Sequence, residues 1–362
     1  PQQQFVGKFK HTLICRLHYF CTFVDVNQSC MCMMNVRVLC FLICVCGLFS
    51  CSSIQTFSFE QLCPAKVTLP VQVQTVAVVN NMPVIPKAKN NLATLGTFDG
   101  SGKLSTEALA DVLADAKYFD QVIICDSALN DLRAEGNGYR PLTHDEVKKL
   151  AADLGVDVIF SLDRVFISNE KKLVEYPGMF ESWPVVRTRV TSVLHVYSPV
   201  REKPLYAVVS ADSVEWNLND VPSDIRMITE MARFSAAAMG RELVPYWTPA
   251  ERIYYAGGCV EMRDAAISVN EGDWRGAYSL WKQLYDGRKS GNMKAHAALN
   301  LSLAAEMEGR LDEAKDWLDK AKPYIKDGSE EDMVWKFNSL QLSKRATDFL
   351  HLHSQMSRFE NN

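Results

Sequence analysis

Cysteine is scarce in most of this 362-residue chain. Eight of its eleven cysteines lie at or before Cys51, which leaves Cys63, Cys125 and Cys259 in the rest of the sequence. Their wide spacing matches neither a zinc site nor a Cys-x-x-Cys motif, and a small disulfide-stapled domain would need a denser set. We therefore expect no metal site and predict buried free thiols, with a single disulfide as the alternative.

The chain also lacks an excess of basic residues. Residues 1–50 hold four of the 39 Lys and Arg residues and one of the 43 Asp and Glu residues, so residues 51–362 carry 35 basic and 42 acidic residues, a net charge of −7. Nucleic-acid-binding proteins neutralise phosphates with clustered Lys and Arg. We expect no nucleic-acid partner, and roughly 310 residues suit two domains.

Recognisable catalytic motifs are missing as well. There is no Gly-x-Ser-x-Gly or His-Glu-x-x-His, and the glycine-rich segment Asp99–Lys103 lacks the P-loop spacing and has Leu104 where a hydroxyl residue would bind magnesium. Cys125 ends a predicted strand and Asp126 follows it, and ligands of α/β proteins gather at such strand ends. We expect a protein that is not an enzyme and has no cofactor. The alternative is a periplasmic hydrolase that acts on an envelope glycan or peptide through Cys125 or Asp126.

An apolar run stands near the N-terminus instead. Residues 38–49 follow Arg37 and end at Leu-Phe-Ser-Cys51, which is the pattern of a bacterial lipoprotein signal peptide. As a helix these residues would rise about 18 Å, short of the roughly 30 Å hydrocarbon core. We predict that Cys51 is lipidated, that 33–50 is the signal peptide and that 1–32 is a non-native or over-extended leader. An uncleaved anchor or an unrelated segment is the alternative.

Residues 75–245 alternate predicted strands with predicted helices. Strands are predicted at 75–79, 121–125 and 156–160, and the helix between the first two is expected to begin at Ser105. Thr143-His-Asp-Glu146 forms a capping box for the next helix, and Gly155 ends that helix. This order predicts an α/β domain with a mixed sheet flanked by helices.

A hairpin and a helix complete this predicted domain. From Val186 to Val196 the apolar residues occupy even positions, which predicts a strand paired with 205–214, and a helix should follow Ser223. Arg187, Arg189 and His195 share the odd positions. They are candidate partner-binding residues for an anionic partner, and an ordinary exposed sheet face is the alternative.

Residues 246–349 contain an internal repeat with a period of 37 residues. The same offsets recur in its two copies, which are Gly272, Trp274, Ala277, Trp281 and Leu284, and Gly309, Leu311, Ala314, Leu318 and Ala321. The pattern resembles tetratricopeptide repeats, although Ser302 stands where such repeats usually have a glycine. We predict an all-α, tetratricopeptide-like domain packed through these residues, with unrelated helical hairpins as the alternative.

The segments that flank these two domains are less regular. Residues 51–74 contain two prolines and are predicted to be a tether, and 350–362 is predicted to be a disordered tail. Tyr246, Trp247, Tyr254 and Tyr255 form an aromatic cluster where the two domains meet. Aromatic residues are enriched at binding hot spots, so these four are candidate partner-binding residues, but a packing role is favoured.

Three segments resemble a Bacteroidetes lipoprotein family of unknown function. They are Thr75–Val79, Leu150–Phe160 and Trp247–Tyr255, and the resemblance covers roughly Cys51–Tyr324. More distantly, the α/β part is similar to a domain of envelope proteins. Those proteins include the curli-secretion channel lipoprotein, the Tol-system β-propeller protein and lipoprotein activators of penicillin-binding proteins.

The resemblance implies partner binding in the cell envelope without catalysis. Ser52 follows Cys51, and no acidic residue stands in 52–58. In a bacterial lipoprotein this pattern implies the periplasmic face of the outer membrane. We therefore predict a lipid-anchored scaffold, assembly or regulatory protein whose partners are other envelope proteins.

Overall fold

The chain divides into two compact units, each described by itself. The structure is a computed structural model that describes residues 54–83, 95–126, 128–129, 140–175 and 182–359. Among these residues, the sheet unit contains Pro64–Tyr246 and the residues from Leu352 on, and the helical unit contains the residues up to Cys63 together with Trp247–His351.

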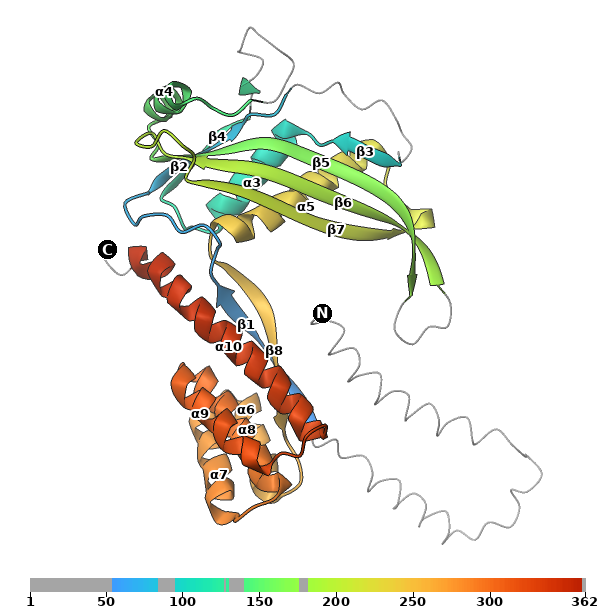
Figure 1. Cartoon of the computed structure of the whole chain (residues 1–362), viewed down its shortest axis with the longest axis vertical. Helices are drawn as coiled ribbons and strands as arrows, with labels where there is room; N and C mark the ends of the chain where they lie inside the picture. Colours follow the sequence, from blue (N-terminus) through green and yellow to red (C-terminus); the bar gives the residue numbers. More distant parts are fainter. Residues whose placement is uncertain (1–53, 84–94, 127, 130–139, 176–181, 360–362) are drawn as a thin grey trace, which may run out of the picture. The chain divides into compact units, whose positions relative to one another are not determined.

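The sheet unit is built on a six-stranded mixed sheet (Figure 1). Its main path, in spatial order, is β4 (Gln121–Cys125), β2 (Thr75–Asn80), β5 (Val158–Glu175), β6 (Ser182–Tyr197) and β7 (Tyr206–Asn217). β2 lies parallel to β4 and β5, whereas β5, β6 and β7 form an antiparallel meander. The short strand β3 (Gly96–Asp99) pairs with the second half of β5, beyond the end of β2.

Helices cover the two faces of this sheet unequally. α3 (Gly102–Asp115) and α5 (Asp224–Leu243) lie along one face, with the 3-10 turn η2 (Leu218–Asp220) before α5 (Figure 1). α4 (His144–Leu154) packs on the other face, where its Val147 and Ala151 contact the β2–β5 side chains of the same cluster. The α/β order predicted from the sequence is therefore confirmed.

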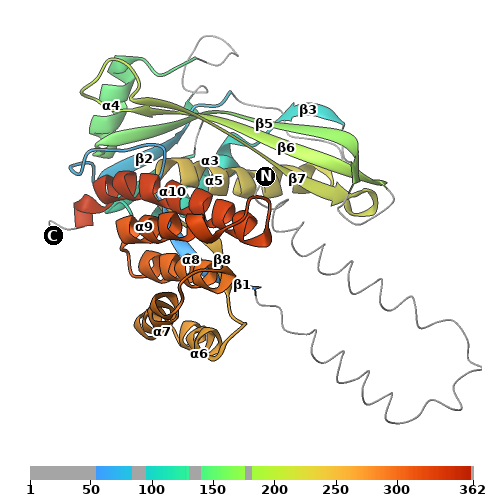
Figure 2. The ribbon, with the colours of Figure 1, turned by 60° about the horizontal axis from the view of Figure 1, so that its bottom comes forward.

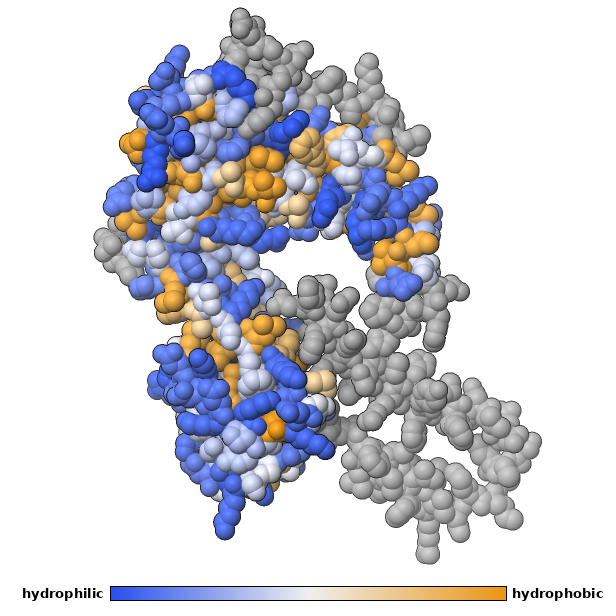
Figure 3. All heavy atoms as spheres, viewed as in Figure 1, coloured by the Kyte–Doolittle hydropathy of each residue, from blue (hydrophilic) through white to orange (hydrophobic). Residues whose placement is uncertain are grey.

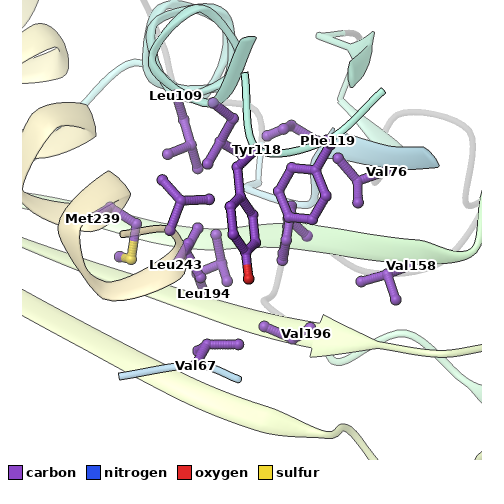
Figure 4. Close-up of a cluster of buried hydrophobic side chains, with 14 of the residues drawn as sticks. Val67, Val76, Leu109, Tyr118, Phe119, Val158, Leu194, Val196, Met239 and Leu243 are labelled. Carbon is purple, nitrogen blue, oxygen red and sulfur yellow. The ribbon is translucent and has the colours of Figure 1, made fainter. Parts of the chain in front are cut away.

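The core between the sheet and the helices α3 and α5 is apolar (Figure 4). Leu109 from α3 and Met239 and Leu243 from α5 meet strand side chains such as Val76 and Leu194, and all five are at most 1% exposed. Fully burying a side chain of this size contributes about 1.5–3 kcal/mol. The even positions of β6 point into this core, as their alternation predicted.

The helix ends follow the local chemistry of the sequence. Thr143 and Glu146 form the predicted capping box at α4, and Gly155 ends that helix in the left-handed region at φ 66°. α3 differs from the prediction, because Ser101 rather than Ser105 caps it through the Leu104 amide. Ser105 is instead buried inside the helix.

The helical unit combines a two-stranded ribbon with a stack of helices. The ribbon pairs β1 (Ile54–Cys63) with β8 (Tyr246–Tyr255). The helices are α6 (Val260–Asn270), α7 (Trp274–Gly287), α8 (Asn292–Met307), α9 (Leu311–Ala321) and α10 (Glu330–Met356), with η3 (Lys322–Tyr324) and η4 (Ser357–Phe359). α7 packs on α6, α8 on α7 and α9 on α8, which is the predicted arrangement of consecutive helix hairpins.

Two buried asparagines complete the hydrogen bonding of β8. The Asn300 side chain accepts from the Tyr255 amide at 2.8 Å and donates to the Tyr255 carbonyl at 2.7 Å. Asn338 does the same for Ile253, at 3.3 and 2.8 Å. Because an isolated two-stranded ribbon is marginal in water, these amides from α8 and α10 act in place of a third strand.

Three segments differ from the sequence predictions. Residues 54–63, expected within a tether, form β1, and 246–255, expected within the all-α domain, form β8. Residues 350–359, expected in a disordered tail, form the end of α10 and the 3-10 turn η4.

In the part of the chain that the structure describes, no helix is long and apolar enough to cross a membrane. Cys51 and the predicted signal peptide lie outside the described residues.

Candidate functional site

The three polar candidates on β6 do not form one patch. Arg187 pairs with Glu215 on β7 (Nε to Oε1 3.0 Å), whereas Arg189 is exposed opposite Ser213. His195 lies eight residues beyond Arg187, about 26 Å along the strand at 3.3 Å per residue. Since Glu215 neutralises Arg187, Arg189 remains the exposed cation of this candidate set.

His195 belongs to a buried polar cluster that the sequence did not reveal. Its Nδ1 contacts the Asp163 carboxylate, which is fully buried. Asp163 Oδ1 also accepts from Ser161 Oγ at 2.8 Å and from Asn81 Nδ2 at 2.7 Å. The register between β5 and β6 shifts between Leu162 and Arg164, which places Asp163 in an irregular part of β5 where its side chain turns inward.

This cluster lies where the strand order changes direction. β2 is flanked by β4 on one side and β5 on the other, and ligands of open α/β sheets often bind at the carboxyl ends beside such a point. Ser161, however, donates to Asp163 and not to His195, and among the described residues His195 bonds to no hydroxyl or thiol. The cluster thus joins Asn81, the residue after β2, to β5 and β6, and its described residues do not assemble a nucleophile with a base.

Cys125 and Asp126 lie at the end of β4, as predicted. Burial, and then the neighbouring Asp126 charge, raise the pKa of the Cys125 thiol, which disfavours the nucleophilic thiolate. Asp126 forms an ion pair with Lys103 at 3.0 Å, and its carbonyl accepts from Asn80 Nδ2 at 2.9 Å. These contacts give both residues a structural environment. Cys63, Cys125 and Cys259 are free thiols, as predicted, but of the three only Cys63 is buried, whereas Cys125 and Cys259 are partly exposed.

Two of the four aromatic candidates are buried. Tyr254 is 2% exposed and its hydroxyl donates to Gln55 Oε1 at 2.6 Å, whereas Tyr255 is 0% exposed and stacks on His296 with ring centroids 3.6 Å apart. Burial raises the pKa of both phenols. Tyr254 and Tyr255 therefore have no surface to offer a partner, and they pack the helical unit. Tyr246 is half-buried, and Trp247 is 66% exposed.

The repeat residues lie at the turns and contacts of the helix hairpins. Gly272 and Gly309 occupy the two equivalent turns with φ of 75° and 77°, a conformation that favours glycine. The residues that follow them at equal offsets are buried, namely Ala277, Trp281, Leu284, Ala314, Leu318 and Ala321. Trp274 packs edge-on against Phe57 of β1 at 4.9 Å, and Leu311 is half-buried.

An exposed apolar hairpin end is a feature that the sequence analysis overlooked. β7 stops pairing with β6 at Val185, and β3 stops pairing with β5 at Asn169, but β5 and β6 continue together to the pair Glu175–Ser182. Beyond these ends, Leu173 is 70% exposed and Trp183 is 50% exposed. Their apolar character was visible in the sequence, but the early end of β3 and β7 was not.

Metal binding finds no support in the described residues, which contain no group of three or more His, Cys, Asp or Glu side chains placed to hold an ion.

Solved structures with a similar arrangement share little sequence with this chain. A dodecamer of a PelC variant from Paraburkholderia phytofirmans is 9% identical, with 52% of this chain and 99% of that chain covered and a TM-score of 0.25. A hypothetical protein of Chlamydia trachomatis is 13% identical (46% and 87% covered, TM-score 0.23). The lipoprotein GNA1162 from Neisseria meningitidis is 14% identical (46% and 99% covered, TM-score 0.21). TM-scores this low say nothing of what this chain does.

Family models give a firmer assignment. No curated protein matches the chain. One domain model of unknown function, DUF6340, matches residues 263–350, which lie in the helical unit. A second one, DUF8603, matches residues 73–255, half of the chain, and covers the whole sheet together with β8. The chain therefore belongs to the DUF8603 family, a family of domains of unknown function.

Proposed function

We propose that this chain is a lipid-anchored protein of the bacterial cell envelope that binds another envelope protein and catalyses no reaction. The lipobox-like sequence before Cys51 supports the anchor. Ser52 after the cysteine and the lack of acidic residues in 52–58 support the periplasmic face of the outer membrane. The observation that carries the binding function is the distal part of the β5–β6 hairpin that the structure describes. We call this part the hairpin tip and define it by Leu173, Val174, Trp183 and Pro184.

The hairpin tip exposes apolar side chains on both of its faces. Leu173 is paired with Pro184, and the next pair, Val174 and Trp183, points to the opposite face because side chains alternate along a strand. In Figure 1 the hairpin runs past the end of β7, and Figure 3 shows hydrophobic surface at this end of the sheet. A ribbon with two apolar faces fits into a groove whose walls contact both of them.

Charges of both signs surround the tip. Lys171 and Lys172 precede it, Glu170 lies 3.4 Å from Lys172, and Glu175 lies closer to the hairpin end than Leu173. Insertion of the tip into a bilayer would carry the Glu175 carboxylate deeper than Leu173, which is unfavourable. An aromatic anchor within a mixed polar rim is typical of protein interfaces. The partner that fits is therefore a protein.

The contribution of Trp183 is expected to be large. Tryptophan is enriched among hot-spot residues, whose truncation costs about 2 kcal/mol or more of binding free energy. The rival hydrolase would depend on a reactive Cys125 or on Asp126. The raised pKa of the Cys125 thiol and the Asp126–Lys103 pair favour neither role.

Photo-crosslinking in intact cells tests this proposal. A photoreactive amino acid is placed at position 183 or 173 of the full chain, with position 200 as the matched control. Val200 is an 86% exposed apolar residue in the other turn of the meander. The proposal predicts that one envelope protein is crosslinked from 183 and from 173 but not from 200. It also predicts that Leu173→Ala removes the crosslink from 183.

Three results would overturn the proposal. They are crosslinks to lipid alone, equal crosslinking of that protein from position 200, and absence of a protein adduct from both tip positions. Because the tip side chains are exposed, the substitutions leave the core of the sheet unit intact, and urea unfolding of each variant verifies this.

A further inference from the structure

The first helix of the helical unit has an apolar outer face. α6 buries Met262, Ala265, Ala266 and Val269, which form its inner face, and it packs on α7. On the opposite face Val260 is 56% exposed and Ile267 is 57% exposed. Figure 2 shows α6 and α7 together at one end of the helix stack. End helices of repeat arrays normally present a polar outer face to water, so this face differs from what an exposed end requires.

Two unpaired charges lie between the apolar residues. Arg263 and Asp264 are exposed on the same face as Val260 and Ile267, at positions i, i+3, i+4 and i+7. Neither forms an ion pair or side-chain hydrogen bond with a described residue. We call Val260, Arg263, Asp264 and Ile267 the α6 stripe.

The α6 stripe is complementary to itself. Its midpoint lies between Arg263 and Asp264, and the four residues are placed symmetrically about that point. When two copies of α6 pack antiparallel around a two-fold axis, Val260 of one copy meets Ile267 of the other. Arg263 of each copy then meets Asp264 of its neighbour, so the apolar contact and the ion pair each form twice. Isologous two-fold interfaces require this self-complementarity.

We propose that two copies of this chain pair through the α6 stripe. The occupant is a second copy because the apolar spacing and the order of the charges match the stripe itself, with no additional partner needed. One helix pair buries far less than the roughly 800 Å² per partner of stable complexes, so the pairing is weak. The lipid anchor proposed above would favour it, because chains held on one membrane have a high local concentration.

Charge exchange on the membrane-anchored full chain tests the pairing. Two differently tagged copies are expressed together, the membranes are treated with a short crosslinker, and the mixed dimer is quantified. With Arg263→Asp alone, the two acidic residues of one copy face the two acidic residues of the other copy. With Asp264→Arg alone, two basic residues face two basic residues in the same way. Each single variant should lower the dimer yield about tenfold, since two ion pairs become two repulsions.

Restoration of the dimer by compensating substitutions distinguishes the two-fold pairing from other contacts between the copies. A copy with Arg263→Asp mixed with a copy carrying Asp264→Arg should recover the mixed dimer, and a chain with both substitutions should recover its own dimer. Lys149→Asp, on the exposed face of α4, is the matched control and should change nothing. An unchanged yield in the single variants, or a loss that neither combination restores, would overturn the two-fold pairing. Neither result would affect the hairpin-tip proposal, whose crosslinks come from the sheet unit.

Discussion

Replacement of Glu306 by glutamine should destabilise the helical unit strongly, because two arginines share this carboxylate in a buried setting. Arg252 donates to it through Nε at 2.9 Å and Nη2 at 2.6 Å, and Arg345 donates through Nη1 at 3.0 Å. Arg252 is 1% exposed and Glu306 is 3% exposed. The two guanidinium groups also flank the Phe59 ring of β1, at 5.3 and 5.4 Å.

The size of the expected loss in stability follows from the buried arginine charge that the substitution leaves without its partner. Removal of one partner from a buried ion pair typically costs about 3–5 kcal/mol, because the other charge remains buried without compensation. Glu306→Gln keeps the volume and one acceptor oxygen, so we expect a loss near the lower end, about 3 kcal/mol. Arg252→Met combined with Glu306→Leu removes both charges and fills the space. That pair should therefore cost much less than the sum of its single changes.

These losses of unfolding free energy are measured by urea unfolding, with tryptophan fluorescence as the signal. Five of the seven tryptophans lie in the helical unit, so the signal reports mainly on this unit. Arg345→Ala is a useful comparison, because the Arg345 side chain is 25% exposed and water compensates part of its loss. Two results would refute the reasoning that Arg252 and Glu306 form a coupled, buried ion pair. One is a loss of unfolding free energy below about 1 kcal/mol for Glu306→Gln, and the other is a loss in the double variant equal to the sum of the losses in the two single variants.

Three further predictions concern other buried polar groups. Asn338→Ala leaves the Ile253 amide and carbonyl without partners and should cost about 2–4 kcal/mol in urea unfolding. Burial lowers the pKa of His296 from 6.5, so the folded chain binds fewer protons than the unfolded chain. Its stability should then fall as the pH drops below about 6.5, and His296→Asn should flatten that part of the profile. Asp163→Asn removes a charged acceptor of three donors and should lower the free energy of unfolding of the sheet unit, measured in urea, by about 1.5–3 kcal/mol.

Much of the sheet unit could be predicted because its signals are local. The buried run of β2, the capping box at Thr143 and the alternation along β6 each lie within a dozen residues. Each pattern is set by which side of one strand or helix meets the core. The repeat turns at Gly272 and Gly309 were equally visible, since a positive φ after a helix favours glycine.

The ribbon of the helical unit could not be predicted because its signals are distant. β1 and β8 are separated by more than 180 residues, and neither shows a clean alternation. Their polar requirements are met from α8 and α10, by Asn300 and Asn338, which in the sequence look like ordinary helical asparagines. The Asp163–His195 contact was hidden for a related reason, since it depends on a register shift between two strands.

The hairpin tip and the α6 stripe can strengthen each other when two paired chains bind one partner at the same time. A chain that pairs through α6 presents two hairpin tips on one membrane. A partner with two tip-binding grooves would then meet the second tip at a raised effective concentration and would bind more tightly than to a single chain. A partner with one groove would gain nothing. Arg263→Asp changes no residue of the sheet unit. It should therefore weaken tip-dependent crosslinking to a two-groove partner, whereas crosslinking to a one-groove partner should stay unchanged. Because this variant alters the number of tips and not the tip itself, a lowered crosslinking yield identifies a partner with two grooves that bind both tips at once.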